Sequence, residues 1–162
     1  MKKNQTSLNA SPADTEEGLR AFSRSLPMAL LRAREAVMAK FRPTLRDHGL
    51  TEQQWRVLRA LNASKVPLRA GELSEQTFIS MPSLSRLLKT LEARDAIQRH
   101  ALHEDLRAAQ LSISRGGKAL VAIIGPLSEA SYAEIAALIG DQELSELERL
   151  LTHVVTRLNC GR

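Results

Sequence analysis

The sequence contains few of the residues that disulfide-stabilised proteins and single-strand-binding proteins need. Cys160 is the only cysteine in 162 residues, so an intrachain disulfide cannot form and any thiol switch must link two chains. Aromatic residues make up only 3% of the chain, which is too few for a surface on which single-stranded nucleic acid stacks. The composition therefore excludes a disulfide scaffold and argues against a single-strand binder.

Long hydrophobic runs and common catalytic motifs are also missing. No uninterrupted apolar run approaches the roughly 18 residues of a membrane span, and the N-terminus lacks a secretory apolar core, so we expect a cytoplasmic protein without a membrane partner. The sequence has no glycine-rich phosphate loop, no Gly-x-Ser-x-Gly and no His-Glu-x-x-His. His100 and His103 would point to opposite faces of a strand, which disfavours a metal pair. We therefore expect no enzyme, metal or cofactor site.

Positive charge is what the chain has in excess. Its 23 lysines and arginines against 18 acidic residues give a net charge of +5 and a pI near 9.9. This balance permits a polyanionic partner. A hydrophobic content of 43% is ordinary for a globular protein, and the length suits one domain with an extension.

The stretch from Ser80 to Leu91 predicts a helix with one apolar face and one polar, basic face. Ser80 can cap its start, and a proline in the first turn costs little there. Leucines recur at i, i+3, i+4 and i+7, at positions 84, 87, 88 and 91. The other face and its flank carry short polar and long basic side chains: Pro82, Ser83, Ser85, Arg86 and Lys89. Such a face suits a helix in the DNA major groove, although solvated helices have similar faces.

The neighbouring segments predict a winged helix-turn-helix. A short helix over residues 70–76, anchored by Leu73, and a turn at 77–79 precede the Ser80 helix. Residues 97–103 and 110–114 are expected to be strands flanking a polar tip at 104–109. Arg99 and His103 on the first strand are candidate phosphate contacts. The predicted fold class is mainly α with a small β-wing.

At the wing, the sequence resembles a known family. Asp105-x-Arg107-x-x-x-Leu111-x-Ile113-Ser114-x-x-Gly117 is similar to the wing signature of the MarR regulators. The resemblance implies that Asp105 braces the wing and that Arg107 enters the minor groove. Asp95 departs from the family pattern, because many relatives have glycine there, but aspartate tolerates the left-handed conformation better than most residues.

The resemblance extends over about residues 20–158 and implies a homodimer. The segment 50–61 resembles the HpaR-like subgroup, which regulates homoprotocatechuate or nicotinate degradation. A leucine-rich seam after Gly140 exceeds what one small domain needs, which supports pairing with a second chain. We expect a flexible arm at 1–19, dimerisation helices at 20–50 and 115–160, and the DNA-binding domain at 51–114.

Arg34 interrupts an apolar row on the long helix expected from Arg20 to Arg46. An arginine in such a row needs either access to solvent or an anionic partner, and that partner is a protein carboxylate or a ligand carboxylate. His48 and Trp55 would add a hydrogen-bonding imidazole and a flat apolar wall, which suits a small aromatic acid. MarR regulators bind such ligands between the dimerisation helices and the winged helix, where these three residues should meet. Arg24 and Phe41 complete the candidate ligand site.

These observations predict a ligand-responsive transcriptional regulator. We expect a homodimer that binds a pseudo-palindromic operator of double-stranded DNA and represses genes of aromatic-acid catabolism. A hydroxyphenylacetate, dihydroxybenzoate or hydroxynicotinate would release it. A redox-responsive regulator using Cys160, a winged-helix module that binds only protein, and activation instead of repression remain open alternatives.

Overall fold

The computed structural model describes residues 22–102 and 105–160. The chain divides into two compact units, residues 1–39 and 40–162. Helix α1 (Leu26–Asp47) begins in the first unit and ends in the second. The arm expected at residues 1–19 lies outside the described residues.

The first unit contains a 3-10 helix at Phe22–Arg24 and the first part of α1. The long helix expected from Arg20 begins at Leu26, with Pro27 in its first turn, where a missing N–H leaves no bond unmade. Pro43 lies inside α1 and does not end it, because the helix continues to Asp47. The lost hydrogen bond is local, and buried Phe41 and Leu45 hold the helix on either side of the proline.

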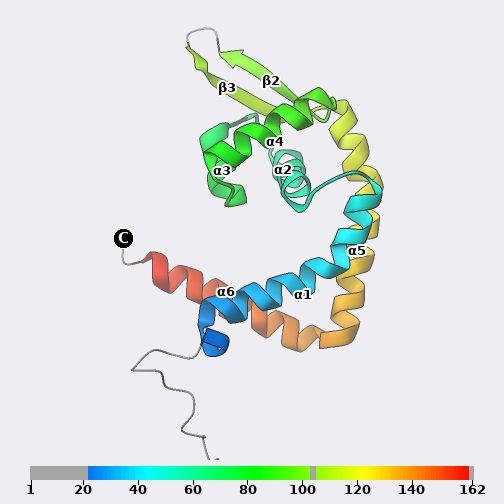
Figure 1. Cartoon of the computed structure of the whole chain (residues 1–162), viewed down its shortest axis with the longest axis vertical. Coiled ribbons are helices and arrows are strands. Elements are labelled where there is room, and N and C mark those ends of the chain that lie inside the picture. The colour runs from blue at the N-terminus through cyan, green and yellow to red at the C-terminus, as the bar shows by residue number, and fades with distance from the viewer. Residues whose placement is uncertain (1–21, 103–104, 161–162) are drawn as a thin grey trace, which may run out of the picture. The chain divides into compact units, whose positions relative to one another are not determined.

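The second unit begins with the end of α1 and contains the winged helix (Figure 1). Its elements are α2 (Glu52–Ala63), β1 (Leu68–Arg69), α3 (Ala70–Thr77), α4 (Met81–Ala93), β2 (Ile97–Leu102) and β3 (Asp105–Ile113). Helix α2 begins with a capping box: the Gln54 N–H donates to Thr51 Oγ1 at 3.2 Å, and the Thr51 N–H donates to Gln54 Oε1 at 2.9 Å. This capping box fixes the residue at which α2 begins.

Helices α3 and α4 form the predicted helix-turn-helix. Leu73 of α3 and Leu84, Leu88 and Leu91 of α4 are all buried, whereas Leu87 is half-buried. The turn between the helices passes through Phe78, whose φ of 52° lies in the left-handed region. Arg56 of α2 donates from Nη1 to the Thr77 carbonyl at 2.9 Å, which ties the end of α3 to the core.

The wing is a three-stranded antiparallel sheet in the order β1-β3-β2. Ile97 pairs with Ile113 and Leu102 with Asp105, so the expected polar tip at 104–109 is wrong for residues 105–109, which belong to β3. The length of β3 is determined by its pairing with β2 across the hairpin. The polar composition of residues 105–109 gave no indication of a strand. Strand β1 was not predicted because its two residues are too short to show alternation; Leu68 pairs with Leu111.

The junction between α4, the wing and the next helix is closely packed. Asp95 adopts a φ of 51°, which is the left-handed conformation that aspartate tolerates better than most residues. Buried Ser114 donates from Oγ to the Asp95 carbonyl at 2.5 Å and accepts the Gly117 N–H at 2.9 Å. A Cβ at Gly117 would press on the Ala96 carbonyl oxygen and lie 2.8 Å from Ile113 Cγ1. The wing signature therefore needs glycine at this position, because the backbone of α5 passes too close to Ala96 and Ile113 to leave room for a side chain.

Two long helices follow the wing, α5 (Arg115–Ile139) and α6 (Asp141–Asn159). Gly125 and Pro126 lie inside α5, which is helical on both sides of them. Among the described residues, α5 alone is long and apolar enough to cross a membrane, a test that the core helix of a soluble protein also passes. Here α5 packs against α2, β3 and α6. Gly140, at φ 102°, separates it from α6, as predicted.

Candidate functional site

The outer face of α4 is a polar and basic surface, as the sequence predicted. Its side chains project to solvent from Pro82, Ser83, Ser85, Arg86 and Lys89, and Ser80 is exposed just before them. Within the described part of the chain, neither the Arg86 guanidinium nor the Lys89 ammonium has a hydrogen-bond or ion-pair partner. Two cations on the exposed face of a second helix-turn-helix helix can bind phosphates or guanine edges.

The start of α4 is held by backbone geometry, not by a side-chain cap. Ser80 has extended backbone angles and its carbonyl accepts the Leu84 N–H at 2.8 Å, but its hydroxyl bonds to Ser83 Oγ at 3.1 Å. At the other end, Arg94 donates from Nη1 to the Gly49 carbonyl at 2.6 Å. This bond ties the end of α4 to the loop before α2.

The wing adds one described candidate to this surface. Arg99 is exposed on β2 and lies 3.5 Å from Glu92 of α4, measured from Nε to Oε2. His103 lies outside the described residues. Asp105 and Arg107 belong to β3 by backbone, but their side chains are outside the description, so the roles implied for them stay predictions.

Two exposed apolar residues at the start of α4 were not predicted as site residues. Met81 is the first residue of α4 and is 49% exposed, and Phe78 in the preceding turn is 90% exposed. The sequence held a signal for Met81, because it lies between two predicted contacts and outside the leucine stripe. Phe78 gave none, since an aromatic residue in a turn is usually assigned to the core.

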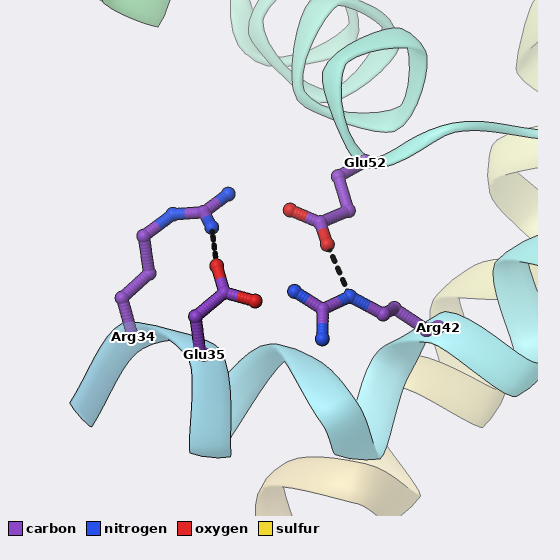
Figure 2. Close-up of polar contacts among 4 residues, drawn as sticks. All are labelled: Arg34, Glu35, Arg42 and Glu52. Carbon is purple, nitrogen blue, oxygen red and sulfur yellow. Dashed lines mark hydrogen bonds and ion pairs between the residues drawn. The ribbon is translucent and has the colours of Figure 1, made fainter. Parts of the chain in front are cut away.

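The five candidate ligand residues belong to different units. Arg24 and Arg34 lie in the first unit, and Phe41, His48 and Trp55 in the second, so their grouping stays a prediction. Arg34 donates from Nη1 to Glu35 Oε1 at 2.6 Å, which is the protein-carboxylate alternative (Figure 2). His48 Nδ1 lies 2.9 Å from the Thr44 carbonyl, and the side chains of Trp55 and Phe41 are buried.

An ion pair joins the end of α1 to the start of α2. Arg42 Nε donates to Glu52 Oε1 at 2.5 Å, and Figure 2 shows the guanidinium and carboxylate facing each other. Glu52 lies in the first turn of α2, where negative charge is favoured by the helix dipole.

A pocket of about 220 Å³ lies between α2 and α5. Its wall contains Trp55, Arg59 and Asn62 from α2 and Val121, Gly125, Ser128 and Glu129 from α5. Ser128 is only 4% exposed, and its hydroxyl finds no hydrogen-bond partner among the residues that the structure describes. A buried hydroxyl without a partner carries a desolvation cost, and this one is closed off from solvent in the single chain.

Tyr132 lies beside Arg59, one of the residues that line this pocket. Arg59 Nη1 is 3.5 Å from Tyr132 Oη, at the outer limit of a hydrogen bond. The Tyr132 ring contacts Phe41 edge-on, with ring centroids 4.8 Å apart. Neither residue was predicted as a site residue from the sequence, although Arg59 lies one helical turn after Trp55 on the same face of α2.

The winged helix and its exposed basic helix define a DNA-binding regulator. A family model described as the MarR family matches residues 48–108. The homoprotocatechuate degradative operon repressor of Escherichia coli is 34% identical over 131 residues, which span 81% of this chain and 88% of the repressor. The chain belongs to the MarR family and is a winged-helix transcriptional repressor.

Two solved structures are similar to this chain over most of its length. NadR in complex with 4-hydroxyphenylacetate is 31% identical, with a TM-score of 0.75 over 85% of this chain and all of that one. CouR bound to a 23-mer DNA duplex is 25% identical, with a TM-score of 0.75 over 82% of this chain and 94% of that one. The predicted fold class and family are thus confirmed.

Proposed function

We propose that this repressor acts as a homodimer on a pseudo-palindromic operator of aromatic-acid catabolism genes and leaves it when a small hydroxylated aromatic carboxylate binds. The observation that carries the effector is the pocket between α2 and α5, with Trp55 and Arg59 in its wall. The DNA contacts proposed for α4 are Ser80, Pro82, Ser83, Ser85, Arg86 and Lys89, with Arg99 from the wing.

The pocket has the groups that a hydroxylated aromatic acid needs. Trp55 offers an apolar wall, and Arg59 offers a cation for the carboxylate. Glu129 would repel a carboxylate but accept a hydrogen bond from a ring hydroxyl, which orients the acid with its carboxylate toward Arg59. NadR, which is similar over 85% of this chain, was solved with such an acid.

The dimer is supported by the apolar face of α6. No residue of α6 is buried in the single chain, and five of its aliphatic side chains are exposed: Leu147, Leu150, Leu151, Val155 and Leu158. A second copy would remove this contiguous apolar surface from water. Two-fold symmetry then places two copies of α4 at half-sites about one helical turn, roughly 10 base pairs, apart.

Release of the operator requires a difference in affinity between two states. A ligand that binds the DNA-competent and DNA-incompetent arrangements equally shifts nothing, however tightly it binds. The effector pocket borders α5, and α5 packs against both α2 and β3. An acid that changes the packing of α2 on α5 therefore changes the support of the winged helix.

The experiment is fluorescence-anisotropy binding of the protein to the intergenic DNA upstream of its own gene. The complex is titrated with hydroxyphenylacetates, dihydroxybenzoates and hydroxynicotinates. We expect salt-sensitive binding that one of these acids abolishes. Tight binding that no acid weakens would contradict the proposed effector but not the DNA-binding repressor. Binding no tighter than to random DNA would favour a protein-interaction module.

Arg59→Gln tests the pocket directly. The substitution removes the charge that would pair with the carboxylate, so we expect the concentration of acid needed for release to rise roughly 10- to 150-fold. DNA affinity without acid should change little, because Arg59 is not on the α4 face.

The matched control is Arg149→Gln, which removes the same charge from α6. Arg149 is exposed and donates two hydrogen bonds to Glu146, at 2.7 and 2.6 Å, which lower the pKa of that carboxyl. It should leave the acid response unchanged. An unaltered acid response in Arg59→Gln, or an equal loss of acid response in both variants, would contradict the proposed effector site.

A further inference from the structure

Met81 is an apolar side chain exposed among the polar and basic residues of the DNA-facing helix. It occupies the first position of α4 and is 49% exposed, whereas the leucines that hold α4 to the core at 84, 88 and 91 are buried. Half of its surface is therefore available to a partner. Its neighbours on either side in the sequence, Ser80 and Pro82, are exposed as well.

The position of Met81 on the helix favours a contact with bases. Residues near the N-terminus of a recognition helix are the ones that reach base edges in the major groove. Met81 shares a row with Ser85 and Lys89, which are one and two turns further along the same side of α4. Arg86 lies five residues on, about 7.5 Å along the helix axis, so the two side chains would reach different base pairs of one half-site.

The chemistry of the side chain selects the base. The C5-methyl group of thymine is an apolar group in a major groove otherwise lined by hydrogen-bonding atoms, and apolar side chains read it by contact. Methionine is unbranched and polarisable, so it can adapt to the position of that methyl group. It offers no strong donor to guanine and no amide to adenine.

The same surface argues for DNA as the occupant instead of another protein. Arg86 and Lys89 are exposed on α4 as well, and a helix that presents two cations beside an apolar side chain fits a phosphate-lined groove. Protein interfaces are enriched in methionine and arginine but depleted in lysine, so Lys89 is the residue that favours DNA as the occupant.

We infer that Met81 is a specificity-determining residue that recognises the C5-methyl group of one thymine in each operator half-site. The inference rests on the proposed placement of α4 in the major groove. It adds a thymine preference to the guanine preference expected from Arg86.

The test replaces each thymine of the bound half-site, one at a time, with deoxyuridine, which lacks only the methyl group. Anisotropy with the full-length protein should find one position at which uracil weakens binding about fourfold per half-site, the value expected for one buried methyl group. Met81→Ala should bind the thymine operator as weakly as the wild type binds the uracil one, and should not distinguish the two. Met81→Leu should keep most of the distinction.

Phe78→Ala is the control, because Phe78 is an exposed apolar residue that precedes α4 and is not part of it. It should retain the preference for thymine. The inference is overturned if wild-type protein binds every uracil operator as tightly as thymine, if Met81→Ala keeps the preference, or if Phe78→Ala loses it. Failure of the wild-type protein to bind the all-thymine operator above random DNA would instead overturn the proposed function.

Discussion

Replacement of Arg86 by alanine is expected to weaken operator binding by about 5- to 150-fold, or ~1–3 kcal/mol, and to relax base preference at one position of each half-site. Arg86 is exposed on α4, one turn after Pro82, and no described residue pairs with its guanidinium. A guanidinium whose N–H groups have no protein partner can donate two hydrogen bonds to the O6 and N7 atoms of guanine. Anisotropy on the operator and on single-base variants at fixed salt measures both effects.

Two further variants separate base recognition from charge in this experiment. Lys89→Ala should lower affinity for operator and random DNA by similar factors and reduce the salt slope by about one, because a phosphate contact carries no sequence information. Arg149→Ala removes a charge from α6 and should change neither the DNA affinity nor the salt slope. Equal losses for Arg86→Ala on operator and random DNA would show that Arg86 contacts phosphate.

Replacement of Gly117 by alanine is expected to lower the free energy of unfolding by about 1–3 kcal/mol, with Tm reduced by roughly 2–12 °C. The new Cβ would press on the Ala96 carbonyl oxygen, and that carbonyl accepts the Ser114 N–H at 3.2 Å. Ala96 is itself fixed by donation of its N–H to Leu91 at 2.9 Å. Because the obstruction is backbone at the junction of α4, wing and α5, it cannot move aside cheaply.

Gly71→Ala is the matched control for this variant. Gly71 is exposed in α3, and a Cβ there would meet no atom within 4 Å. We expect this variant to be more stable by about 0.5–1 kcal/mol, since alanine loses less backbone freedom in a helix. Thermal unfolding at one fixed protein concentration compares the two, because the Tm of a dimer depends on concentration. A Gly117→Ala protein as stable as wild type would contradict the close approach.

Local patterns predicted the helix-turn-helix well. Leucines at helical spacing identified both α4 and its buried face, and the expected helix at 70–76 differs from α3 by one residue. The wing signature led to Ser114 and Gly117, whose roles the structure explains through contacts with Asp95 and Ala96. Each of these features is encoded within a dozen residues, where side-chain periodicity and turn chemistry act directly.

Sequence reasoning was less reliable where distant residues meet. The two-residue strand β1 exists only because Leu68 pairs with Leu111. Arg59 and Tyr132 are 73 residues apart, and no spacing rule connects them. Arg34 was noted because of its place in an apolar row, but the row could not show that its neighbour Glu35 pairs with it.

The sequence by itself thus determined the winged helix-turn-helix, the exposed polar and basic face of its second helix, and the family. These follow from periodicity, capping and a short signature, all of which are local and survive without knowledge of the rest of the chain. Only the tertiary structure revealed the pocket between α2 and α5, the unpartnered Ser128 hydroxyl and the exposed Phe78. A pocket, a missing hydrogen bond and an exposed fraction are properties of how elements pack, and packing is decided by contacts between segments that are far apart in the chain.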